Sequence, residues 1–277
     1  MKETILVAVA LLPAIALCGY VFYKDRVEKE PLSLLLLLLT AGAICCYPAS
    51  FLEHWLSPLI DGVFRNATPY VYQFMKYFFG VALVEEGMKL FALTYLTKKN
   101  ENFDCFFDGL IYSVFISLGF AALENVMYSF SYGMETALLR AVTAVPGHMF
   151  FAVLMGYHYS FWHLKDHTLK TEQRLITSGM IIHPKRMISS RNNRLSCLLV
   201  PVLAHGLYDY LCVLSDVWAL WGLVIFLLGM YVYCFATIRK MSLDDQWEQI
   251  YIYNLLKKKY PELPKDFMWE QNEPITL

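Results

Sequence analysis

Two glutamates and a lysine lie within one long apolar stretch of this chain. In the segment VEEGMKL, Glu85 is four residues before Lys89 and Glu86 is three residues before it. At these spacings both carboxylates can face the lysine on one side of a helix. Ionisable residues inside a membrane span are costly, so they indicate a functional site. A carboxylate placed there can take a proton from water, which is the first step of a hydrolysis.

Polar residues also occur on three other apolar stretches: Glu124 with Asn125, His148 after a Pro-Gly pair, and His205 four residues before Asp209. With a helical rise of about 1.5 Å per residue, they and the glutamate pair lie roughly 15–24 Å from the predicted cytoplasmic ends of their helices. We therefore expect four helices to meet around one polar layer. Histidines in that layer can orient a water, stabilise an oxyanion or bind zinc together with a carboxylate.

The composition is that of a membrane protein. Of the 277 residues 57% are hydrophobic and only 17% are charged, and the net charge of −1 gives no indication of nucleic-acid binding. Stretches of about 20 apolar residues predict seven spans. They cover roughly residues 4–23, 32–54, 69–97, 108–130, 135–162, 195–212 and 217–238. The predicted fold is therefore an all-α, polytopic membrane helix bundle, with the first span retained as an anchor.

The loop charges predict the orientation of this bundle. The segments 24–31, 98–107 and 163–194 and the tail after 238 hold 18 Lys and Arg residues, against only Lys2 and Arg65 in the segments between them. Basic residues concentrate on the cytoplasmic side, so the N-terminus is expected outside and the C-terminus in the cytoplasm. We expect one membrane domain over 1–240 and a cytoplasmic tail over 241–277. A short helix in the tail should end at Pro261 and Pro264.

Other polar residues have structural interpretations. Arg140 is expected either to anchor its helix at the outer interface or to support the site. Pro146 is expected to free a backbone carbonyl and bend its helix. Interfacial or structural roles are predicted for Glu53, His54 and Lys76. Solvation in or near the polar loop 163–194 is predicted for His158, His163, His167 and His183.

The motifs resemble those of a known family. VEEGMKL is similar to the EExxK motif of the PrsW intramembrane proteases. GFAALENVMY, RAVTAVPGHMFFAVLMGY and AHGLYDYL resemble the remaining motifs of that family in order, over about residues 70–215. The PrsW family is similar in turn to the CAAX prenyl endopeptidases and the bacterial Abi proteins.

The resemblance implies a role for each residue. Glu85 corresponds to the glutamate that activates water, Glu86 to the second carboxylate, and His148 to the histidine that shares the water. His205 and Asp209 correspond to the pair that stabilises the oxyanion. An ionised aspartate is a poor oxyanion donor, so Asp209 is expected to orient His205 or to help hold a metal. Supporting roles are predicted for Lys89, Glu124, Asn125 and Arg140.

The catalytic type stays open between a glutamic and a metal-dependent protease. We expect no cofactor, with zinc bound by His148, His205 and Glu86 as the alternative. The resemblance implies an endopeptidase in the bacterial inner membrane. It would make the first cut in a single-span protein such as an anti-sigma factor, at the start of a stress response. Expected partners are that substrate and the lipid bilayer, without nucleic acid, and the oligomeric state is not indicated. The alternatives are a non-catalytic membrane scaffold of the same fold, or a proton-coupled transporter, against which the lack of an inverted repeat weighs.

Overall fold

The computed structural model describes residues 2–268, and this part of the chain is almost entirely helical. The helices are α1 (Lys2–Lys24), α2 (Leu32–Phe64), α3 (Pro69–Met75), the π-helical segment η1 (Lys76–Ala82), α4 (Leu83–Thr97), α5 (Asp108–Tyr132), α6 (Met134–Val142), α7 (Ala144–Thr177), α8 (Arg191–Val213), α9 (Val217–Leu243) and α10 (Glu248–Lys259). Within residues 2–268 there is no strand, only an isolated antiparallel bridge between Cys105 and Trp247. The predicted all-α class is confirmed.

Six helical stretches in the described residues are long and apolar enough to cross a membrane. They are Glu3–Lys24, Leu32–Phe64, Asp108–Tyr132, Met134–Thr177, Arg191–Val213 and Val217–Leu243. The remaining predicted span, 69–97, is one continuous helical stretch made of α3, η1 and α4, and it carries the charged residues discussed above. The chain is therefore a multi-pass membrane protein, whereas the count of seven spans and the orientation stay predictions.

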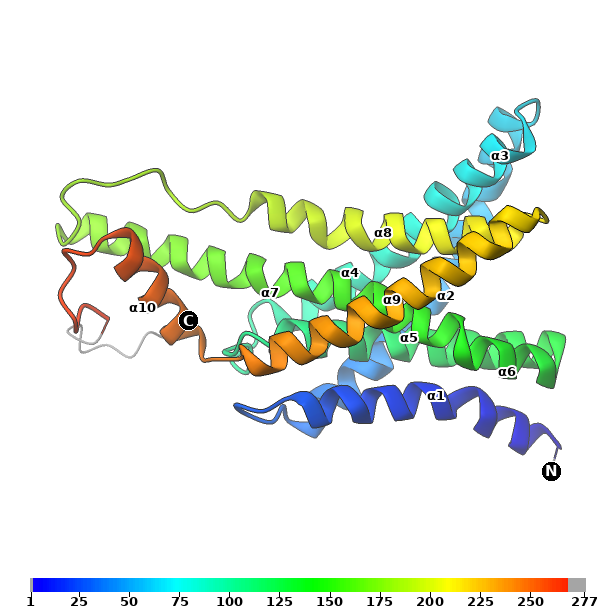
Figure 1. Cartoon of the computed structure of the whole chain (residues 1–277), viewed down its shortest axis with the longest axis horizontal. Coiled ribbons are helices and arrows are strands. Elements are labelled where there is room, and N and C mark those ends of the chain that lie inside the picture. The colour runs from blue at the N-terminus through cyan, green and yellow to red at the C-terminus, as the bar shows by residue number, and fades with distance from the viewer. Residues whose placement is uncertain (1, 269–277) are drawn as a thin grey trace.

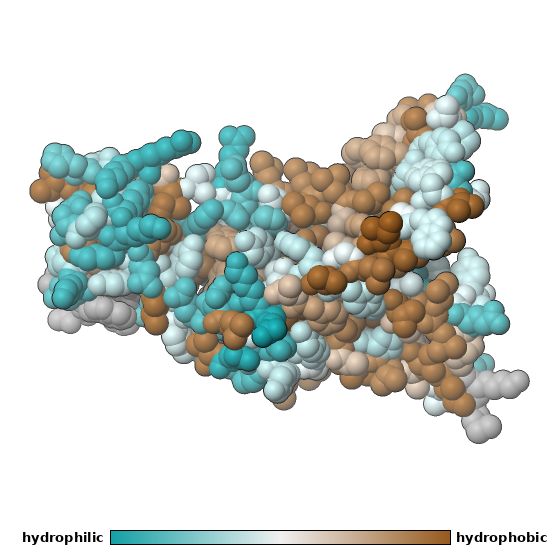
Figure 2. Space-filling view, in the orientation of Figure 1, coloured by the Kyte–Doolittle hydropathy of each residue, from teal (hydrophilic) through white to brown (hydrophobic). Residues whose placement is uncertain are grey.

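Helix α5 lies at the centre of the bundle and contacts α1, α2, α4, α6 and α7. Helices α7 and α8 run side by side along the molecule, with α9 across them and α1 along one edge (Figure 1). α1 and α9 are mostly exposed and apolar, as expected of helices that face lipid. Hydrophilic side chains gather at the end that carries α10, and hydrophobic ones cover much of the rest (Figure 2).

Two glycines allow α2 and α5 to approach closely. A Cβ atom on Gly42 would lie 1.9 Å from the backbone oxygen of Ile116, and one on Gly119 would lie 1.9 Å from that of Leu39. Only a residue without a side chain fits at such a backbone contact. Small residues are the usual means of packing helices in a membrane, where no hydrophobic effect drives them together. This contact brings α2 next to the polar layer on α5.

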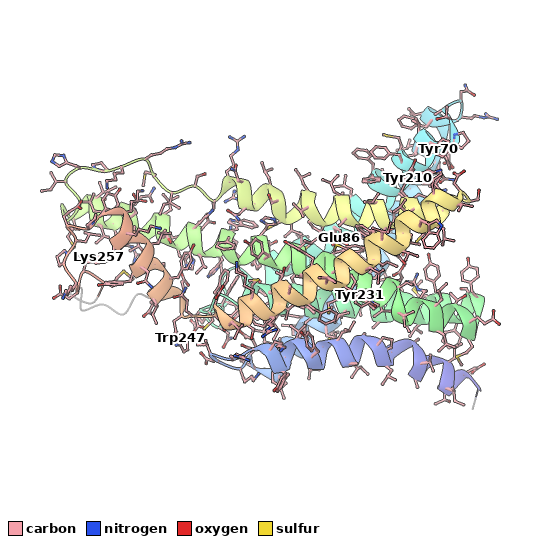
Figure 3. All side chains as sticks on the ribbon, in the orientation of Figure 1. Tyr70, Glu86, Tyr210, Tyr231, Trp247 and Lys257 are labelled. Carbon is pink, nitrogen blue, oxygen red and sulfur yellow. The ribbon has the colours of Figure 1, made fainter. Side chains whose placement is uncertain are left out.

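The predicted span 135–162 is broken rather than bent. α6 ends at Val142 and α7 begins at Ala144, so Pro146 lies in the first turn of α7, where a missing N–H costs nothing. The carbonyl that this proline leaves free belongs to Val142. It accepts a hydrogen bond of 2.9 Å from the hydroxyl of Tyr231 on α9, which Figure 3 labels. The freed carbonyl was predicted correctly, but its consequence is a new helix start that carries His148.

The predicted loop 163–194 is shorter than expected. α7 continues to Thr177, and α10 packs against this extension. Leu175 of α7 joins Ile252 and Leu256 of α10 in a small apolar core. A polar segment can stay helical when a partner helix covers one of its faces. The predicted tail helix is confirmed, and it ends at Lys259, just before Pro261.

Candidate active site

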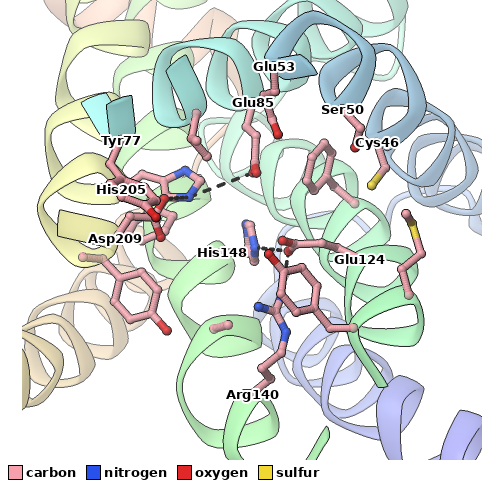
Figure 4. A pocket seen from close by; sticks show the side chains of 17 residues that line it. Cys46, Ser50, Glu53, Tyr77, Glu85, Glu124, Arg140, His148, His205 and Asp209 are labelled. Atoms are coloured by element: carbon pink, nitrogen blue, oxygen red, sulfur yellow. Dashed lines mark hydrogen bonds and ion pairs between the residues drawn. The ribbon is translucent and has the colours of Figure 1, made fainter. Parts of the chain in front are cut away.

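A cavity of about 210 Å³ lies inside the bundle where α2, η1, α4, α5, α6, α7 and α8 meet. Its volume corresponds to several water molecules, since each occupies about 30 Å³ in the liquid. Figure 4 shows carboxylate and imidazole side chains pointing into it from different helices. Of the predicted site residues, the cavity is lined by Glu85, Glu124, Arg140, His148, His205 and Asp209. Glu86 and Lys89 lie directly behind Glu85.

The glutamate pair lies at the start of α4, directly after the π-helical segment η1. One extra residue in a helical turn rotates everything that follows by about 100°. The segment therefore decides which side of the helix faces the cavity. π-Helical turns are rare and are common at functional sites.

Lys89 holds three side chains of the site together. Its Nζ atom donates to Glu85 Oε2 at 3.1 Å, to Glu86 Oε1 at 2.8 Å and to His148 Nδ1 at 3.1 Å. It also lies 4.3 Å from the ring centroid of Phe120. Lys89 is only 1% exposed, so its charge is compensated by these contacts and not by water. The lysine is thus a fixed counter-charge for the two glutamates.

These contacts define the tautomer of His148. A lysine ammonium has no acceptor, so Nδ1 of His148 must accept from Lys89, and the ring proton is on Nε2. Nε2–H then donates to Glu124 Oε2 at 2.9 Å. Arg140 donates to the same oxygen at 2.7 Å and to Asn125 Oδ1 at 3.1 Å. His148 is therefore neutral, and a chain of hydrogen bonds that ends at Arg140 holds its ring in place.

His205 is held between carboxylates. Its Nδ1 atom lies 2.9 Å from Glu86 Oε1, and its Nε2 atom lies 3.3 Å from Asp209 Oδ2 and 4.0 Å from Glu85 Oε2. The ring stacks on Phe151 with centroids 4.7 Å apart. Ionised carboxylates only accept, so both nitrogens donate and the ring is an imidazolium. Asp209 thus contacts His205 on the side opposite Glu86.

The two glutamates have different surroundings. Glu86 is fully buried, and one of its oxygens contacts both Lys89 and His205. Glu85 lines the cavity, and its nearest cation is Lys89 at 3.1 Å. Glu85 is the carboxylate of the pair that can reach a water.

Two polar groups of the site were not expected from the sequence. Glu53 was interpreted as interfacial or structural, but it lines the cavity from α2, one helical turn from Ser50. Tyr77 of η1 also lines it. The sequence does hold a signal for Glu53, namely an ionisable residue in an apolar stretch. Because Glu53 is near the predicted end of its span, it was interpreted as interfacial or structural. Asn125 lies behind the cavity, where its amide donates to the Ala10 carbonyl of α1 at 2.9 Å.

The donor types around the cavity fit a divalent metal. Ligand atoms of Glu85, Glu86 and His148 lie within 4.8 Å of one another, and carboxylate with imidazole is a set that zinc accepts. The predicted zinc set included His205 in place of Glu85, but both nitrogens of His205 face carboxylates. The ammonium of Lys89 lies among the three donors and would have to move for an ion to bind there.

The fold and this site define a class, namely multi-pass membrane proteins with a buried carboxylate–histidine centre around a cavity. Comparison with known families narrows this class. Residues 30–238 match the model of the PrsW family intramembrane metalloprotease, and the chain belongs to this family.

Curated relatives agree with this assignment. The chain is 30% identical to Protease PrsW of Geobacillus kaustophilus, over 86% of this chain and 91% of the relative. It is 30% identical to Protease PrsW of Oceanobacillus iheyensis, over 74% and 82% of the two chains. It is 29% identical to Protease PrsW of Clostridioides difficile, over 90% and 96%. No solved structure gives a significant match.

Proposed function

We propose that this protein is an intramembrane endopeptidase in which Glu85 activates a water to hydrolyse a peptide bond. The observation that carries the proposal is the convergence of Glu85, His148 and His205 on one cavity inside the bundle. The membership of a protease family supports it. The proposed substrate is a single-span membrane protein of the bacterial inner membrane, such as an anti-sigma factor, as the resemblance implied.

The residues divide the reaction between them. Glu85 takes a proton from a water in the cavity, and the resulting hydroxide attacks the carbonyl carbon of the scissile bond. The oxyanion that forms shares the Nε2–H of the protonated His205 with Asp209, whose carboxylate lies 3.3 Å from that nitrogen. Glu85 then returns its proton to the leaving amine. Lys89 keeps the neighbouring Glu86 ionised. Neutral His148 accepts from Lys89 and donates to Glu124, and so holds both groups in place beside the water.

A metal would be held by Glu85, Glu86 and His148. When bound, it would polarise the scissile carbonyl and increase the acidity of a bound water. The steps assigned above to Glu85 and His205 depend only on residues of this chain.

The test is cleavage of a single-span substrate by the purified protein in detergent, with the wild type and the Glu85→Gln variant each assayed with and without a zinc chelator. A matched control is Glu135→Gln, at an exposed position in the first turn of α6. The proposal expects Glu85→Gln to lose cleavage by about 10²–10⁴-fold while the control keeps it. Equal cleavage by wild type and Glu85→Gln would overturn it.

The same variant separates the alternative functions. A scaffold would show no cleavage by the wild type, and Glu85→Gln would alter partner binding or abundance. A proton-coupled transporter would lose flux in Glu85→Gln and would cleave nothing.

A further inference from the structure

A second cluster of possible metal ligands lies far from the cavity, at the junction of α7 and α10. It consists of His163 and His167 of α7 and Glu248, the first residue of α10. One ligand atom from each lies within 4.8 Å of the others. The prediction that these histidines are solvated was wrong, because the side chain of His163 is 4% exposed and that of His167 is 12% exposed. The start of α10 covers them.

The contacts of this cluster are incomplete. His167 Nδ1 makes a short contact with Glu248 Oε1. His163 Nε2 faces Glu248 Oε2 at 3.5 Å, and both of these atoms are buried without a hydrogen-bond partner in the described structure. A buried polar group without a partner has lost its water and gained no hydrogen bond in return. The two atoms are within ion-pair distance of each other, but they form no hydrogen bond, so both stay open to a further ligand.

From these contacts we propose that His163, His167 and Glu248 bind a zinc-class divalent ion. Two histidines four residues apart on one helix face, completed by a carboxylate, are a ligand set that zinc accepts. With zinc–ligand bonds of about 2.0–2.1 Å, neighbouring ligand atoms of a tetrahedral site are roughly 3.3–3.4 Å apart. The separation of His163 Nε2 and Glu248 Oε2, 3.5 Å, is close to this value. An ion there satisfies both unpartnered atoms.

The surrounding structure holds the three ligands in place. The ring of His163 stacks on Phe103 with centroids 3.7 Å apart. The backbone N–H of Glu248 donates to the carbonyl of Asp104 at 2.6 Å, and the bridge between Cys105 and Trp247 fixes the start of α10. Figure 3 labels Trp247 at this junction. Ligands fixed before the ion arrives lose little freedom on binding.

A fourth ligand position can be filled by water. A cavity of about 170 Å³ lies beside His163 and His167. Its other lining residues are Tyr159, Trp162, Asp166 and the lysines Lys98, Lys99 and Lys170. The site is separate from the proposed catalytic centre, which shares no residue with it. Its role is to fasten α10 to the end of α7, where the two helices lie side by side in Figure 1.

The test measures bound metal on the full chain, purified in detergent and stripped with a chelator. Zn²⁺ is added and dialysed, and metal per chain is compared between the wild type, Glu248→Gln and His167→Asn. A matched control is His183→Asn, because His183 is an exposed histidine in the loop after α7. The proposal expects the two ligand variants to bind one equivalent less than the wild type, and the control to bind the same amount. Equal binding by all four proteins would overturn it.

A second measurement reports on the ligands directly and does not depend on those variants folding. Co²⁺ bound to the wild type should give the visible absorption of a four-coordinate site. His167→Cys should add a thiolate charge-transfer band, which Co²⁺ held by Glu85, Glu86 and His148 would not give. Absence of both signals would overturn the proposal. Chelation should also speed tryptic cleavage near Lys257 of α10 in the wild type but not in Glu248→Gln. The effect of a chelator on substrate cleavage at the cavity should be measured in Glu248→Gln. That variant lacks the site at α7 and α10, so loss of metal from this site cannot contribute to the effect.

Discussion

Replacing Glu85 or Glu86 by glutamine removes the same charge from adjacent positions. The structure nevertheless predicts that Glu86→Gln mainly lowers stability and that Glu85→Gln mainly lowers the rate of cleavage. Glu86 is fully buried and contacts Lys89 at 2.8 Å and His205 at 2.9 Å. Without its charge, two buried cations lose a partner, and breaking a buried ion pair costs about 3–5 kcal/mol. We therefore expect Glu86→Gln to lose about this much unfolding free energy.

Glu85→Gln should affect the chemistry more than the stability. Glu85 lines the cavity, lies 3.1 Å from Lys89 and is 4.0 Å from His205. Its loss removes one hydrogen bond to a charged group, worth about 1.5 kcal/mol, because Lys89 keeps Glu86 as a partner. Cleavage should nevertheless fall by about 10²–10⁴-fold, since no other group replaces the base.

The assay pairs two readouts on the same preparations. Unfolding by denaturant in one detergent gives the free energy, and cleavage of a single-span substrate gives the rate. Glu135→Gln is the control, because it makes the same substitution at an exposed position and shows its effect on stability and cleavage away from the site. The reasoning is refuted if Glu86→Gln is as stable as the wild type while Glu85→Gln unfolds, because that result would exchange the roles of the two carboxylates.

Three further predictions concern packing, positioning and pH. Gly119→Ala should lower the free energy of unfolding by about 1–3 kcal/mol, because the new Cβ would lie 1.9 Å from a backbone oxygen of α2. Gly19→Ala has open space around its Cβ, so in the same assay it should leave the free energy of unfolding unchanged or raise it. Arg140→Met should slow cleavage by up to about 100-fold without unfolding the chain, because Glu124 would no longer be held against His148. Burial raises the pKa of Glu30, in the loop between α1 and α2, from 4.5 to about 7, so the stability that this group contributes is present below about pH 4.5 and is lost as the pH rises through 7. Glu30→Gln should remove that part of the pH dependence of Tm between pH 5 and 8.

Each of these has an outcome that contradicts it. Equal stability of the two glycine variants would mean that α2 and α5 are not in backbone contact. Cleavage by Arg140→Met at the wild-type rate would mean that the arginine only anchors its helix. A Tm of the wild type that rises between pH 5 and 8 would have the wrong sign for a carboxyl group with a raised pKa.

Much of the site could be predicted from local sequence. The spacing of Glu85, Glu86 and Lys89 determines that they share a helix face, and the structure shows both ion pairs. His205 and Asp209 are four residues apart and contact each other as expected. These are contacts within one helix, so the helical period alone predicts them.

Contacts between different helices could not be predicted in this way. Arg140 had two interpretations of equal weight, and only its distance of 2.7 Å to Glu124 favours a role at the site. Glu53 was interpreted as interfacial or structural because it is near the predicted end of its span, and only the packing of α2 against its neighbours places it at the cavity. The π-helical turn before Glu85 was not predicted either, because nothing in the composition of its seven residues indicates it.

By itself the sequence determined that this is a membrane helix bundle with ionisable residues inside its apolar stretches, since long apolar stretches require helices and charges at that depth indicate a functional site. Only the tertiary structure decided which glutamate faces the cavity, where α7 begins and that His163 meets Glu248. Those outcomes depend on residues far apart in the chain, whose approach is set by the packing of whole helices and not by the spacing within one.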